Sequence, residues 1–212
     1  MNLDLATMLY SLPAVVLGLT VHEFTHAFAA SRLGDPTAAD QGRLSLNPIR
    51  HLDPIGFMFI VVAGFGWAKP VAFDKTYLKS PRRDEALIAL AGPLSNLALG
   101  ILAALVLKLV SAVLPHAATG AYPVMVNTLL YLVFINFGLF IFNMIPIPPL
   151  DGSHVLFYWL RIDQALEARF YKLGMPLLFG VLILERATKI DILPIGKAVR
   201  WMAVAVFKIL GM

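Results

Sequence analysis

The residues of this sequence best suited to chemistry stand together at His22, Glu23 and His26, in the pattern His-Glu-x-x-His. Residues four apart on an α-helix share one face and lie about 6 Å apart along the axis, so two such imidazoles can bind one divalent ion. Glu23 lies beside the pair, within reach of a water on that ion, and can take its proton. The pattern predicts a metal site with its own general base.

The setting of these side chains strengthens the prediction. The run from Leu5 to Ala30 is otherwise almost wholly apolar. A histidine pair on a helix is often only a polar stripe that faces a loop. Ionisable groups inside a membrane segment are costly, however, and they usually have a partner and a function. The apolar setting therefore favours a metal site over a polar stripe.

Asp151 is the candidate for a third ligand. A catalytic zinc usually has three protein ligands and one open position, and the chain has no cysteine to supply a thiolate. By itself, the pair Asp151-Gly152 more often marks a turn. Here it follows an apolar run and the prolines Pro146, Pro148 and Pro149, which exclude a regular helix and present Asp151 on unwound backbone. We therefore favour the ligand.

The composition is that of an integral membrane protein. The 212 residues are 59% hydrophobic and 14% charged, with a mean hydropathy of +0.78, whereas soluble domains have about 25% charged residues. The net charge of +4 is modest and does not indicate a nucleic-acid partner. No basic segment precedes the first apolar run, so we interpret that run as a retained helix and not as a signal peptide. Residues 1–212 are expected to form one membrane domain.

The apolar runs predict an all-α polytopic fold with a three-helix catalytic core over about residues 5–155. Four to six segments can cross the bilayer, and the sequence leaves their number open. Three runs are long enough to span, and two shorter ones follow them: 5–33, 86–114, 123–145, 172–184 and 194–210.

The segment between the first two spans is expected to contain extended structure. Residues 42–46 alternate in polarity and predict a short strand. The apolar run 55–65 is too short to span as a helix and is interrupted by glycine. We therefore expect a re-entrant or interfacial β-hairpin over residues 55–73, with an exposed edge that can pair with an extended peptide.

The distribution of basic residues predicts the orientation. Residues 32–83 contain eight Lys and Arg, and residues 115–123 contain none. By the positive-inside rule, the N-terminus lies outside and the 34–84 region lies in the cytoplasm. Asn96 and Asp151 then lie with His22 and His26 toward the cytoplasmic ends of their helices, at one depth.

Three motifs together resemble the site-2 protease family of intramembrane zinc metalloproteases. They are residues 22–26 (His-Glu-Phe-Thr-His), 92–96 (Gly-Pro-Leu-Ser-Asn) and 150–152 (Leu-Asp-Gly). The resemblance implies one zinc ion per chain, bound by His22, His26 and Asp151, with Glu23 activating the water. It also implies that Asn96 helps to hold the substrate or the transition state, although an Asn near a helix start can simply make hydrogen bonds locally or to a neighbouring helix.

The same resemblance implies hydrolysis of peptide bonds within or near transmembrane segments of protein substrates. It points to the small prokaryotic branch without PDZ or CBS domains, located in the cytoplasmic (inner) membrane. The lipid bilayer is the implied surrounding. The natural substrate, its cleavage site, the regulation and the oligomeric state are left open.

Other polar residues have weaker claims on the site. His51 is either a fourth ligand or, as a loop residue beside Asp53, solvated. His154 either orients the Asp151 carboxylate or lies at the membrane interface. Asn136 and Asn143 are expected to bond neighbouring helices, and His116 is expected at the surface of the outer loop.

Two other functions compete with proteolysis. A metal or proton transporter would also place His and Asp inside the membrane, but along its whole depth, whereas here they lie at one level. An inactive membrane scaffold would have lost Glu23 or a metal ligand, and none is lost.

Overall fold

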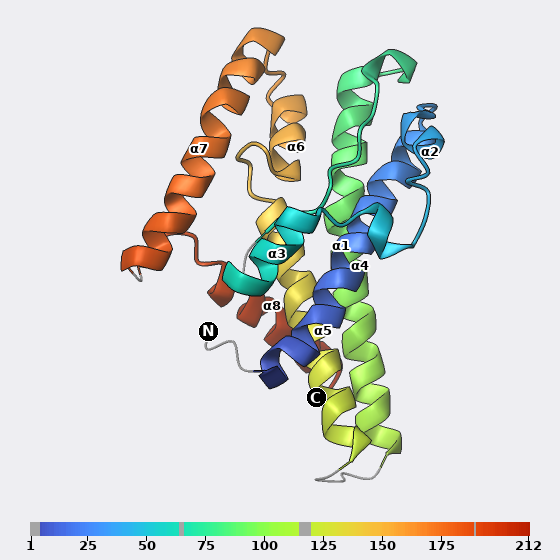
Figure 1. The fold of residues 1–212 in the computed structure, drawn as a ribbon, viewed down its shortest axis with the longest axis vertical. Helices are drawn as coiled ribbons and strands as arrows, with labels where there is room; N and C mark the ends of the chain where they lie inside the picture. Colours follow the sequence, from blue (N-terminus) through green and yellow to red (C-terminus); the bar gives the residue numbers. More distant parts are fainter. Residues whose placement is uncertain (1–4, 64–65, 115–119, 189) are drawn as a thin grey trace.

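The computed structural model describes residues 5–63, 66–114, 120–188 and 190–212, and these residues form helices and no strand (Figure 1). The α-helices are α1 (Leu5–Arg32), α2 (Thr37–Asp40), α3 (Pro54–Ala63), α4 (Pro81–Val113), α5 (Ala121–Asn143), α6 (Asp151–Trp159), α7 (Gln164–Thr188) and α8 (Ile195–Ile209). Two 3₁₀ turns, η1 (Pro48–Arg50) and η2 (Lys75–Tyr77), lie between α2 and α4. The prediction of an all-α fold is confirmed.

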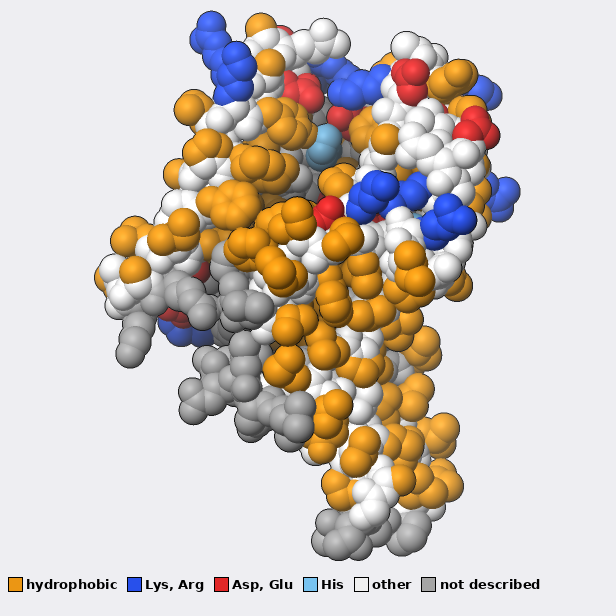
Figure 2. Space-filling model, in the orientation of Figure 1, with side chains coloured by type: hydrophobic (Ala, Val, Ile, Leu, Met, Phe, Trp, Pro, Cys, Tyr) orange, Lys and Arg blue, Asp and Glu red, His pale blue; other side chains and the backbone are white. Residues whose placement is uncertain are grey.

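The core is formed by α1, α4 and α5, which run alongside one another (Figure 1). Within the described residues, these three helices are long and apolar enough to cross a membrane, and α7 and α8 are not among them. Charged side chains gather at one end of the molecule, while hydrophobic side chains cover much of the visible face below (Figure 2). The protein is therefore an integral membrane protein with one polar end.

The turn after α1 fixes the polar end of that helix. Gly34 has φ of 108°, a conformation that residues with a Cβ rarely adopt. The buried Asp35 carboxylate then accepts hydrogen bonds from the backbone N–H of Thr37, at 2.9 Å, and of Asp74, at 2.8 Å. Asp35 thus ties the end of α1 to the segment that leads into α4.

The second long helix begins earlier than the apolar pattern predicted, at Pro81 and not at Ala86. Proline suits the first turn of a helix, and the Asp84 carboxylate accepts the N–H of Ser80 at 2.8 Å. Residues 92–96 therefore lie well inside α4 and not in its first turns. Their side chains come from a continuous helix, even though Pro93 is among them.

The prediction of strands between the first two spans is wrong for the described residues. Residues 42–46 form turns and bends, and residues 54–63 form α3. Asp53 initiates this helix, because its carboxylate accepts the N–H of Gly56 at 2.7 Å. The remaining β-type pairing is one isolated bridge between Leu52 and Ala68.

The length of α3 agrees with the prediction that the apolar run 55–65 is too short to span a bilayer as a helix. Its 10 residues measure about 15 Å, too short to span a bilayer. Residues 66–74 then continue as irregular, extended chain toward η2. Residues 64–65, at the end of the predicted hairpin strand, lie outside the described residues, and entry of this loop into the membrane stays a prediction.

The C-terminal third of the chain contains the helices α7 and α8. Helix α7 begins at Gln164, earlier than the predicted segment at 172, and stands apart from the core in Figure 1. Helix α8 buries Val199 and Ala203 in one apolar cluster with Val133 and Phe137 of α5. His116, expected in the outer loop, lies outside the described residues.

Candidate metal centre

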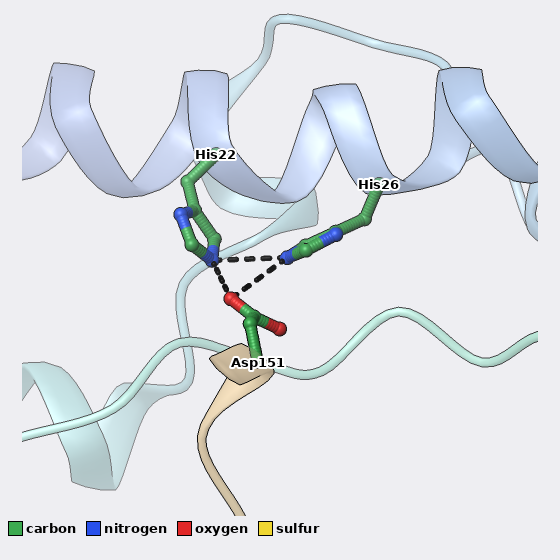
Figure 3. A group of neighbouring side chains, drawn as sticks. All are labelled: His22, His26 and Asp151. Carbon is green, nitrogen blue, oxygen red and sulfur yellow. Dashed lines mark hydrogen bonds and ion pairs between the residues drawn. The ribbon is translucent and has the colours of Figure 1, made fainter. Parts of the chain in front are cut away.

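Two histidines and one aspartate from helices far apart in the sequence converge on a single point (Figure 3). His22 and His26 project from one side of α1, and Asp151 faces them from the first residue of α6. The two Nε2 atoms lie 3.0 Å apart, and Asp151 Oδ2 lies 3.2 Å from Nε2 of His22 and 3.5 Å from Nε2 of His26. The structure thus brings together the three predicted ligand residues.

His22 is oriented by α4. Its Nδ1 lies 2.7 Å from Oδ1 of Asn96, which can only accept, so Nδ1 carries the proton. The orientation of the Asn96 amide is supported on its other side, because Nδ2 donates to the carbonyl of Gly18 and to Oδ1 of Asn136, both at 3.0 Å. The Nε2 atom of His22 is therefore the ring nitrogen that faces the centre.

His26 is oriented by the same helix. Its Nδ1 donates to the backbone carbonyl of Ile88 at 2.7 Å, which again leaves the Nε2 lone pair free. Gly92 lies between these two anchors. A Cβ on Gly92 would come within 2.4 Å of His26 Nε2 and 2.6 Å of His22 Cε1. Glycine is therefore required there, because any side chain would displace both imidazoles.

The donor set fits a divalent metal ion. Two nitrogen lone pairs and a carboxylate oxygen point at one another, an arrangement that repels itself without a cation between them. Asp151 Oδ2 is buried and has no hydrogen-bond partner among the described residues. Zinc ligands at 2.0–2.2 Å in tetrahedral array are about 3.3 Å apart, close to the three separations found here.

The Asp151 carboxyl is suited to bind as an anion. Burial raises its pKa, but the facing imidazoles of His26 and His22 lower it further, and the net effect holds the pKa well below its ordinary value. Asp151 is the first residue of α6, directly after the non-helical residues 144–150. A Cβ on Gly152 would lie only 2.4 Å from the carbonyl oxygen of Met144. Only glycine therefore fits at this turn.

Glu23 directly follows His22 in α1, and its side chain is largely buried. It is 8% exposed and makes no hydrogen bond or ion pair within the described part of the chain. The Glu23 carboxylate interacts electrostatically with the loop residue Arg43. Burial lowers the pKa of Arg43 from its ordinary value, and the Glu23 carboxylate opposes that shift. The carboxylate predicted to act as the base is therefore unpaired but lies in a partly positive field.

Asn96 makes hydrogen bonds to neighbouring helices, which is one of the two roles expected for it. Its side chain is fully buried, and both ends of the amide are engaged, by His22, Gly18 and Asn136. In this arrangement the amide orients His22, and a role toward the substrate stays a prediction. Asn136 bonds across helices as expected, whereas Asn143 donates to Leu139 of its own helix.

The two remaining histidines lie outside the group formed by His22, His26 and Asp151. His51 is buried, not solvated, and its Nε2 bonds the carbonyl of Ser45 at 2.6 Å. The described polar contacts of His154 are with residues other than Asp151, and its role in orienting that carboxylate stays a prediction. Its Nδ1 pairs with Glu85 at 2.9 Å, and its Nε2 bonds the hydroxyl of Tyr171 at 2.7 Å.

Sequence reasoning missed Glu85 and the Ile88 carbonyl. Glu85 precedes the apolar run and so resembles a residue of the polar loop, but it is 8% exposed. The signal that could have found it is its spacing, since Glu85, Ile88, Gly92 and Asn96 lie three and four residues apart and so share one helix face. A backbone carbonyl leaves no trace in a sequence.

Comparison with known proteins agrees with this geometry. The family model for "Peptidase family M50" matches residues 10–184. "Putative zinc metalloprotease YwhC" of Bacillus subtilis (strain 168) is 40% identical over 159 residues, which cover 72% of this chain and 69% of that protein. "Putative zinc metalloprotease MJ0611" of Methanocaldococcus jannaschii is 30% identical over 176 residues, 78% of this chain and 80% of that protein.

A longer relative is also similar. "Putative zinc metalloprotease Rip2" of Mycolicibacterium smegmatis is 32% identical over 146 residues, which cover 66% of this chain and 53% of that protein. The chain thus matches about half the length of this mycobacterial relative. No solved structure matches.

Proposed function

The chain belongs to peptidase family M50 and is a zinc metalloprotease of the site-2 protease type, and we propose that His22, His26 and Asp151 bind its zinc while Glu23 acts as the general base. The observation that carries the proposal is the convergence of two imidazole nitrogens and one carboxylate oxygen within 4.8 Å of one another, with the Glu23 carboxylate alongside. Outer hydrogen bonds from α4 fix the two imidazoles in the state that a metal requires.

The residues of the chain divide the work of peptide hydrolysis. When bound, zinc supplies a Lewis acid that polarises the scissile carbonyl and lowers the pKa of a bound water toward about 7. Glu23 accepts the proton of the attacking water and then passes it to the leaving nitrogen as the C–N bond breaks. The burial of His22, His26 and Asn96 keeps the ligand geometry fixed while the charge on Glu23 changes.

The substrates we propose are transmembrane segments of membrane proteins. The backbone carbonyls of such a helix are hydrogen-bonded within the helix. The scissile segment must therefore unwind before a water activated by Glu23 can attack it. Residues 66–74 offer a place to hold it extended. Within the described residues, the backbone N–H groups of Val71, Ala72 and Phe73 have no hydrogen-bond partner, and an added strand would satisfy them.

The proposed orientation places the polar end of the core in the cytoplasm of a prokaryotic inner membrane, with the N-terminus outside. The excess of Lys and Arg in residues 32–83 supports it. Cysteines introduced at positions 40 and 80 should then react only with reagent that reaches the cytoplasm, and a cysteine at position 118 only from outside. Labelling of positions 40 and 118 from one side would overturn the orientation.

The test of the function is cleavage of a helix-containing membrane substrate by purified protein and by Glu23→Gln. The substitution keeps the size of the side chain and removes the base, so the variant should bind zinc as tightly as wild type and cleave at least about a hundredfold more slowly. A control variant, Glu185→Gln on α7, should cleave normally. Cleavage by Glu23→Gln within tenfold of wild type would mean that another group activates the water.

A further inference from the structure

One face of α4 touches both histidine ligands, and it continues to a third anchor. Proceeding toward the start of the helix, Asn96 bonds His22, Gly92 makes room for both imidazoles, and the Ile88 carbonyl bonds His26. Helices α1 and α4 pack against one another. Moving toward the start of α4 therefore means moving toward the end of α1, from His22 to His26. The next position on the same face is Glu85, and its partner is not on α1.

Glu85 reaches instead to the short helix that carries Asp151. Its Oε1 lies 2.9 Å from Nδ1 of His154, and its Oε2 lies 2.7 Å from Nζ of Lys75, so both oxygens are occupied. The Glu85 side chain is only 10% exposed and that of His154 19%, so this pair is screened far less than a surface ion pair. A bond of this kind constrains the position of α6 relative to α4.

His154 is well placed to transmit that constraint to Asp151. It lies three residues further along α6, on the same side of the helix and about one turn away. Its second nitrogen is held as well, because Nε2 bonds the Tyr171 hydroxyl of α7 at 2.7 Å. With α6 only 9 residues long and preceded by non-helical chain, few other polar contacts fix its rotation.

We propose that Glu85 and His154 are positioning residues that set Asp151 against the histidine pair, so that one face of α4 orients all three metal ligands. The inference rests on the proposed function, because it assumes that Asp151 binds the zinc. Outer contacts of metal ligands typically change the affinity for the metal by about 10–100-fold. Loss of the Glu85–His154 pair should therefore lower the zinc affinity more than it changes any other property.

The experiment measures zinc affinity of the full chain in detergent by competition with a chelator. His154→Leu removes the donor, and its affinity should fall at least about tenfold, whereas His154→Gln keeps an N–H donor and should stay within about threefold of wild type. Glu167→Gln is the matched control. Glu167 belongs to the same polar cluster, and its ion pair among the described residues is a long one, 3.9 Å from Lys75, so its loss should change the affinity less than twofold.

A second background separates positioning from general loosening of the fold. In Asp151→Ala, the residual affinity comes from the histidine pair, so adding His154→Leu should cause no further loss. Adding Asn96→Ala should still reduce it, since Asn96 acts through His22. An equal effect of His154→Leu in both backgrounds would overturn the inference and show a merely structural role.

The failure of the inference can be distinguished from failure of the proposed function. If Asp151→Ala loses zinc while His154→Leu and Glu85→Gln bind it as wild type does, the metal site stands and the positioning role falls. If Asp151→Ala itself binds zinc with wild-type affinity, the proposed ligand set is wrong and the inference falls with it.

Discussion

The metal-binding core and the loop that follows it differ in how their polar groups are used. In the core, Asn96, Asn136 and Thr20 are buried and all have hydrogen-bond partners. The loop that follows instead exposes the apolar side chains of Ile55 and Met58 on α3, and within the described residues the backbone N–H groups of residues 71–73 have no partner. This difference agrees with the proposal that the core holds the metal and that the loop meets lipid and an extended chain.

The comparison predicts that changes in the core act through zinc, and the largest effect is expected at Gly92. Gly92→Ala would place a methyl group within 2.4 Å of His26 Nε2, so it should abolish both zinc binding and cleavage. Metal content by atomic absorption and a cleavage assay would measure this. Gly138→Ala is the matched control, because its Cβ would meet nothing closer than 3.9 Å. Normal zinc content in Gly92→Ala would contradict the described packing.

A smaller loss is expected for Asn96→Ala. The substitution removes the acceptor for His22 Nδ1 and leaves Asn136 with an unpaired oxygen, so zinc affinity should fall by about 10–100-fold. Saturating zinc should then restore much of the activity. If zinc affinity is unchanged while turnover falls, Asn96 acts on the substrate, as the family resemblance implies, and its amide must leave the arrangement seen here.

The smallest effect is expected in the loop. Val61→Pro removes a backbone donor inside α3 and should displace the chain that follows, so cleavage should fall about tenfold with zinc content unchanged. Parallel assays of metal and activity would show the separation. Loss of zinc in this variant would mean that the loop supports the core and that the two regions are not independent.

The sequence predicted the core well because long apolar runs and the motifs at residues 22–26 and 150–152 are local signals. It could not predict how the ends of those runs are capped. Asp84 extends α4 back to Pro81, and Asp53 begins a helix where a β-hairpin was expected. Both are side-chain-to-backbone bonds whose geometry depends on the folded chain.

The outer contacts of the metal centre were predicted less well, since they join residues far apart in sequence. Gly92 was identified as part of the motif at residues 92–96, and the structure shows that its missing side chain makes room for two imidazoles of α1. His154 was considered a partner of Asp151 or an interfacial residue, and nothing in the sequence indicated that it pairs with Glu85 on another helix. Burial of His51 likewise depends on how the loop folds over it.

The central claim is that Asp151 completes a zinc site with the histidine pair of α1, and metal content tests it most directly. Purified wild-type protein should contain about one zinc ion per chain. Asp151→Ala should lose most of it, because the histidine pair alone lacks the third donor. Asp163→Ala, a control in the exposed turn before α7, should retain it. Full zinc content in Asp151→Ala would contradict the account.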